Sequence, residues 1–237
     1  MKNRMFVGLV AAATALVLSS SLATAQEAYS ANAIGVIKKT IPAGKMALIS
    51  IPLDNTESTN AAIPFLELPF LSSLPNKSTA NMWDSAGVKW VSGKKSLGKW
   101  GGDITNMYIH SGQSIFFENG GSSPVTLIFS GEVPSDAEIS VGLAAPSHMV
   151  ACANPYPVSF DFTNSVLARQ AKNGSQANFW DMNANTWRFC KKSLGKWGGT
   201  ASTVVEPGDG FMFQSGATET NTAWVVSKPY EWPVTAE

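Results

Sequence analysis

The feature that most constrains this chain is an internal repeat. The sequence Lys-Lys-Ser-Leu-Gly-Lys-Trp-Gly-Gly, here called the nonapeptide, occurs twice without a change, at residues 94–102 and 191–199. The same offset of 97 residues relates Asn-Met-Trp-Asp at 81–84 to Asn-Phe-Trp-Asp at 178–181. A fixed offset over this many positions indicates a tandem duplication, so the fold must be buildable from two similar units of about 97 residues.

Each unit has the pattern of an all-β fold. Short β-branched runs at 33–37 and 45–51 are separated by Pro-Ala-Gly, and those at 114–117 and 125–129 flank Asn-Gly-Gly. Short strands with frequent turns are typical of sandwiches and barrels. We expect two tandem β-sandwich or barrel-like domains, at 26–135 and 136–237, and a single fused sandwich is the alternative.

Little helix is expected in either unit. The one helical pattern in the second unit covers residues 165–172, with Asn164 as a candidate cap and Asn173-Gly174 as the stop. Its counterpart in the first unit opens with Pro69, which is acceptable in a first helical turn. The sequence therefore predicts one short helix per unit at most.

Residues 1–25 have the layout of a secretory signal peptide. Lys2 and Arg4 precede an apolar stretch at 5–18, and Ala-Thr-Ala at 23–25 forms a cleavage site before Gln26. A transmembrane anchor is the alternative, but the apolar stretch is shorter than the roughly 18–20 residues that a span needs. We expect a secreted protein, extracellular, on the cell surface or periplasmic, with no membrane span after signal removal.

Composition excludes several classes of function. Lys and Arg total 17, Asp and Glu total 17, and only 14% of residues are charged, so nothing suggests the basic surface of a nucleic-acid binder. There are two histidines and no recognisable hydrolase, metalloprotease or nucleotide-binding motif, so we expect no enzyme and no cofactor. Residues 181–185 imitate the start of a calcium loop but lack the required Gly (Thr186 instead) and Glu (Lys192 instead), so no metal site is predicted.

Three segments together carry a resemblance to known proteins. They are Ile-Pro-Ala-Gly-Lys-Met-Ala-Leu-Ile-Ser-Ile-Pro at 41–52, Leu-Ile-Phe-Ser-Gly-Glu-Val-Pro at 127–134 and Pro-Gly-Asp-Gly-Phe at 207–211. With the signal peptide and the tandem repeat, the chain resembles uncharacterised β-rich secreted proteins of planctomycete- and verrucomicrobia-like bacteria. The resemblance implies an exported bacterial protein, and it implies no activity.

The two nonapeptides are the first candidate binding surface. A Trp beside glycines can present an open face for a sugar ring, and the neighbouring lysines would favour an anionic polysaccharide. Two copies on one chain would add avidity. The alternative is that both tryptophans are core anchors and the glycines only shape a hairpin. The candidate ligand-binding residues are Lys94, Lys95, Lys99, Trp100, Lys191, Lys192, Lys196 and Trp197.

Four other tryptophans and the two cysteines supply two further expectations. Trp83 and Trp90, like Trp180 and Trp187, lie seven residues apart, which fits either core packing or a shared aromatic platform. Cys152 and Cys190 are the only cysteines, and in an exported protein such a pair is expected to form a disulfide.

Two functions fit these observations. The first is a non-enzymatic structural or assembly protein of the cell surface, which self-associates through exposed β-edges or apolar patches. The alternative is a carbohydrate-binding module, possibly for an anionic polysaccharide, acting through the two nonapeptides. Exposure of Trp100 and Trp197 would favour the alternative.

Overall fold

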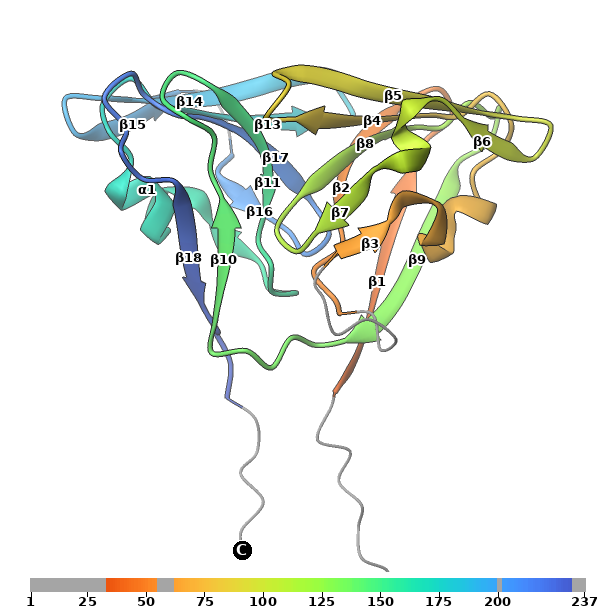
Figure 1. Ribbon diagram of the computed structural model, residues 1–237, viewed down its shortest axis with the longest axis horizontal. Coiled ribbons are helices and arrows are strands. Elements are labelled where there is room, and N and C mark those ends of the chain that lie inside the picture. Colours follow the sequence, from red (N-terminus) through yellow and green to blue (C-terminus); the bar gives the residue numbers. More distant parts are fainter. Residues whose placement is uncertain (1–32, 55–61, 200–201, 232–237) are drawn as a thin grey trace, which may run out of the picture. The chain divides into compact units, whose positions relative to one another are not determined.

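The computed structural model describes residues 33–54, 62–199 and 202–231, which belong to one compact unit. The predicted signal peptide at 1–25 lies outside the described residues. The fold is all-β, as predicted, and its strands pair antiparallel throughout the described part of the chain. In Figure 1 the first repeat is coloured from red to green and the second repeat from green to blue.

The two repeats have the same strand order. In the first, one sheet has the order β2-β8-β4-β5-β6, beside the pairs β1-β9 and β3-β7. In the second, the orders are β11-β17-β13-β14-β15, β10-β18 and β12-β16. The first repeat comprises β1 (Ile34–Ile41), β2 (Met46–Ser50), β3 (Ala62–Pro64), β4 (Thr79–Asp84), β5 (Lys89–Ser96), β6 (Lys99–Gly101), β7 (Tyr108–His110), β8 (Ser114–Glu118) and β9 (Val125–Glu132). The second comprises β10 (Glu138–Gly142), β11 (Met149–Ala153), β12 (Phe160–Asp161), β13 (Gln176–Asp181), β14 (Thr186–Ser193), β15 (Lys196–Gly199), β16 (Val204–Val205), β17 (Gly210–Gln214) and β18 (Ala223–Ser227).

Helical structure is confined to short segments between strands. The predicted helix of the second repeat is α1 (Val166–Gln170), and its cap is Ser165, whose side chain accepts from the Ala168 N–H, rather than Asn164. The counterpart is the 3-10 helix η2 (Pro69–Ser72), which begins at the predicted proline. The other 3-10 segments are η1 (Phe65–Glu67), η3 (Asp103–Asn106) and η4 (Phe162–Asn164). In the described part of the chain, no helix has the length and apolar character needed to cross a bilayer.

Each repeat has its own hydrophobic core, and a third cluster joins the two. The joining cluster contains Leu48 and Phe116 from the first repeat and Ala151 and Met212 from the second. Leu48 corresponds to Ala151 in the repeat alignment, and Phe116 to Met212. The outward faces of the two five-stranded sheets therefore bury their central residues against each other.

Hydrogen bonds between the repeats come in equivalent pairs. Trp83 Nε1 donates to Met149 O at 2.6 Å, and Trp180 Nε1 donates to Met46 O at 2.7 Å. The amide of Ser50 likewise donates to Gly208 O at 2.9 Å. Its counterpart, the amide of Ala153, donates to Gly112 O at 2.7 Å. The two repeats therefore contact each other through equivalent residues, as the two subunits of an isologous dimer do.

The predicted disulfide is wrong, because Cys152 and Cys190 are free thiols. Cys152 lies on β11 and Cys190 on β14, with β17 and β13 between them in the sheet. Three strand spacings amount to about 14 Å. A disulfide needs Cα atoms within roughly 7 Å, so the sheet order forbids the bond. Both side chains are buried and serve as small core residues.

Candidate functional site

Each nonapeptide is a β-hairpin with a two-residue turn. Leu97 (φ 49°) and Gly98 (φ 77°) connect β5 to β6, and Leu194 and Gly195 connect β14 to β15 with the same angles. Positive φ at both positions is the requirement of a type I′ turn, which glycine meets easily. The amide of Gly98 donates to Asn76 Oδ1 at 2.8 Å, and the second repeat has the same bond to Asn173.

The second lysine of each nonapeptide is buried. Lys95 Nζ donates to the carbonyls of Leu71 (2.8 Å), Ser72 (3.3 Å) and Leu74 (2.7 Å), around the end of η2. Lys192 Nζ donates to the carbonyls of Ala168 (2.8 Å) and Arg169 (3.0 Å) in α1. These ammonium groups donate to backbone carbonyls at the ends of η2 and α1, where helical carbonyls lack intrahelical partners. Lys95 and Lys192 are therefore occupied inside the protein.

The tryptophans of the nonapeptides point inward. Trp100 packs edge-on against buried Phe65 with ring centroids 5.3 Å apart, and Trp197 packs against buried Phe162 at 4.9 Å. Trp197 Nε1 donates to Ala168 O at 2.9 Å, whereas the buried Trp100 Nε1 atom has no partner in the described part of the chain. This geometry favours the core-anchor alternative over the open stacking face.

The other candidate lysines are exposed. Lys94 and Lys191 project from β5 and β14, and Lys99 and Lys196 follow the hairpin turns. Lys94 alternates with buried Lys95, so it shares the outward face of the sheet with Trp90. Lys191 shares a face with Trp187 in the same way. The structure thus separates the eight predicted residues into an inward structural set and an outward set of four lysines.

Four other tryptophans, Trp83, Trp90, Trp180 and Trp187, gather where the repeats meet. The ring centroids of Trp83 and Trp90 are 5.1 Å apart, and those of Trp180 and Trp187 are 5.2 Å apart. Each pair is nearly edge-to-face. Phe116 contacts three of them, with centroids 5.8 Å from Trp90 and 5.3 Å from Trp180 and Trp187. Trp90 remains 42% exposed and Trp187 38% exposed. Trp83 and Trp180 are therefore half-buried beside the joining cluster, whereas Trp90 and Trp187 keep exposed faces.

A groove opens beside the exposed rings. Its volume is about 400 Å³, and we call it the aromatic groove; it is lined by Trp83, Trp90, Met149, Asn178, Trp187 and Met212. Asn178 is 9% exposed, and its Nδ2 atom is buried without a hydrogen-bond partner, while its Oδ1 accepts from Gln176 Nε2 at 2.6 Å. A buried amide without a partner costs about 1–3 kcal/mol. Asn178 therefore lines the groove with an amide group that has no acceptor among the described residues.

Two residues that line the groove differ in environment from their counterparts in the first repeat. The position of Met212 is taken by the bulkier Phe116 in the first repeat, and the Phe116 ring contacts Trp90 and Trp180. The counterpart of Asn178 is Asn81, which is only half-buried and accepts from Ser92 Oγ at 2.6 Å. In the second repeat Phe189 replaces that serine. Sequence reasoning missed Asn178 because its isolation arises only when the sheets pack.

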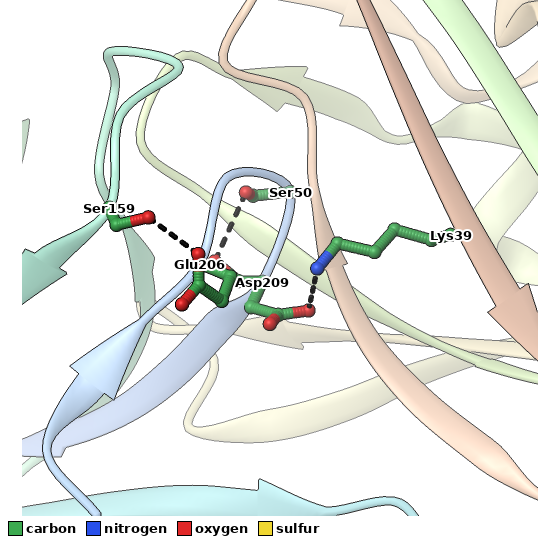
Figure 2. A network of polar contacts seen from close by, with 5 residues as sticks. All are labelled: Lys39, Ser50, Ser159, Glu206 and Asp209. Atoms are coloured by element: carbon green, nitrogen blue, oxygen red, sulfur yellow. Dashed lines mark hydrogen bonds and ion pairs between the residues drawn. The ribbon is translucent and has the colours of Figure 1, made fainter.

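Apart from the aromatic groove, a polar cluster lies where the loop before β17 meets the first repeat (Figure 2). Lys39 Nζ pairs with Asp209 at 2.7 Å, Ser50 Oγ donates to Asp209 O at 3.2 Å, and Ser159 Oγ donates to Glu206 at 2.5 Å. Burial raises the pKa of Asp209, and Lys39 counteracts part of that rise. Since each polar group already has a protein partner, this network joins the repeats rather than offering a reactive group.

The described residues contain no group of three His, Cys, Asp or Glu side chains placed to hold a metal ion. Comparison of the chain with protein-family models, with curated proteins and with solved structures found no match in any of the three. Function therefore has to be inferred from the chain's own residues, and the aromatic groove is the candidate site.

Proposed function

We propose that this is a non-enzymatic, exported protein that binds carbohydrate in the aromatic groove. One observation carries the proposal: two exposed indole rings, Trp90 and Trp187, flank the buried, unpartnered donor of Asn178. The apolar face of a sugar stacks on aromatic rings, and its hydroxyls accept hydrogen bonds from amides. The site differs from the one expected from the sequence, because Trp100 and Trp197 face the cores.

The groove lining supports binding without catalysis. All six lining residues are aromatic, thioether or amide side chains, so none can act as an acid, a base or a strong nucleophile near neutral pH. A volume of about 400 Å³ lies in the usual range of small-ligand sites, and it would take one or two sugar units. The predicted signal peptide places such a protein where extracellular polysaccharides occur.

The test is titration of the protein lacking residues 1–25 with a panel of neutral and acidic polysaccharides. Calorimetry and tryptophan fluorescence measure the binding. Met212→Phe copies the residue of the first repeat into the groove, so we expect at least a tenfold loss of affinity with the fold retained. Asn178→Ala should also weaken binding. Leu194→Ala is the control, because this side chain is 92% exposed on a hairpin tip. Unchanged affinity in Met212→Phe, or no binding across the panel, would refute the proposal.

A structural or assembly role is the second candidate, and a different surface favours it. The β1-β9 ribbon presents Ile34 (63% exposed), Val36 (59%) and Ile128 (51%) on one face. Exposed β-branched residues on an edge ribbon promote association between chains. Light scattering over a range of concentrations tests this role: association should be lost in Val36→Lys, and a protein that is monomeric throughout would exclude it.

A further inference from the structure

Polar side chains lie beside the aromatic groove on the outward face of the second repeat's five-stranded sheet. On the outward face of the sheet, Gln176 is paired with Lys191 on one side and Gln214 on the other. Asn178, the unpartnered donor of the groove, lies two residues along β13 on the same face, about 7 Å away. Phe189, 48% exposed, lies between Lys191 and Trp187 on that face. The exposed ring of Phe189 therefore connects the indole ring of Trp187 to the exposed ammonium group of Lys191 along one face of β14.

The first repeat has a similar arrangement with one added negative charge. Thr79 is paired with Lys94 on one side and Glu118 on the other, and its hydroxyl donates to the Glu118 carboxylate at 2.8 Å. Glu118 corresponds to Gln214, so a carboxylate accompanies Lys94 but not Lys191. The strand residues on the outward face of β11, β17, β13, β14 and β15 include no acidic residue.

We propose that the ligand of the groove is an acidic polysaccharide, a uronic-acid polymer, bound with its carboxylate toward Lys191. This inference rests on the proposed sugar-binding function and adds the ligand class and its direction. The sugar ring stacks on Trp187, a ring substituent accepts from Asn178 Nδ2, and Lys191 and Gln176 attract the anionic group. Glu118 makes the equivalent end of the first repeat unsuitable, because it repels the same anion.

The experiment compares polygalacturonate with its fully methyl-esterified form, which has the same backbone without the charge. We expect the acidic form to bind more tightly and to lose affinity as salt rises, because the added contact is between exposed charges. Lys191→Gln should weaken binding of the acidic form about three- to fivefold, the range expected for one exposed ion pair, and leave the ester unaffected. Gln214→Glu, which copies the first repeat, should act in the same direction.

Lys94→Gln is the matched control and should leave both affinities unchanged. Equal binding of the two forms, or equal effects of Lys191→Gln and Lys94→Gln, would overturn the acidic-ligand inference while leaving sugar binding intact. If the proposed function itself is wrong, neither form binds, or Met212→Phe has no effect on either. The two failures are therefore distinguishable in one set of titrations.

Discussion

Replacement of buried Lys95 by methionine should destabilise the protein far more than the same replacement at its exposed neighbour Lys94. Lys95 is 7% exposed, and its ammonium group donates to the carbonyls of Leu71, Ser72 and Leu74. Methionine has a similar length but cannot donate, so these carbonyls lose a charged partner. Hydrogen bonds to charged groups contribute about 1.5–3 kcal/mol each, and relief of the buried charge offsets part of their loss. We expect a net loss of about 3 kcal/mol.

Urea unfolding followed by tryptophan fluorescence measures this loss. With a denaturant slope of about 2–3 kcal/mol per molar, the midpoint should fall by roughly 1 M in Lys95→Met. Lys94→Met changes the same chemistry on an exposed face and should remain within about 0.5 kcal/mol of the parent protein. Equal midpoints for the two variants would refute the assignment of the buried lysine as a cap for η2.

Three further predictions follow from the packing. Burial raises the pKa of Cys190 to about 11 and raises the pKa of Cys152 further. A thiol reagent should therefore label neither cysteine in the folded protein and both after denaturation, and a reductant should not change the melting temperature. Detection of one mole of disulfide per chain would contradict this prediction. Hydrogen bonds from Thr203 and Thr163 lower the pKa of Asp161, so its ionised form stabilises the fold above the usual Asp pKa of about 3.9, and this stability is lost as pH falls through the lowered value. The stability deficit of Asp161→Asn should therefore be largest near pH 7 and shrink in acid, and a deficit independent of pH would exclude the ionic role. Trp83→Phe removes the bond to Met149 O and should cost about 1 kcal/mol in thermal unfolding, with a similar cost for Trp180→Phe; no loss in either would show that these bonds do not stabilise the contact between repeats.

The candidate site was only partly predictable. Sequence alignment of the repeats identified the four clustered tryptophans and left open whether they form a platform or a core. It also placed the emphasis on Trp100 and Trp197, whose inward orientation follows from cross-strand pairing with buried Lys95 and Lys192. Asn178 and Met212 gave no signal of their own, because their importance depends on what faces them across the junction between the repeats.

The sequence by itself determined the duplication, the all-β class and the turn positions, because these depend on local pattern and on residues such as Gly98 that meet a backbone requirement. Only the tertiary structure decided which tryptophans face solvent, that Cys152 and Cys190 are too far apart to bond, and that a groove opens beside Met212 and Asn178. The physical reason is that strand order and the contact between the two sheets bring together residues far apart in the chain. No periodicity along the chain encodes those neighbours.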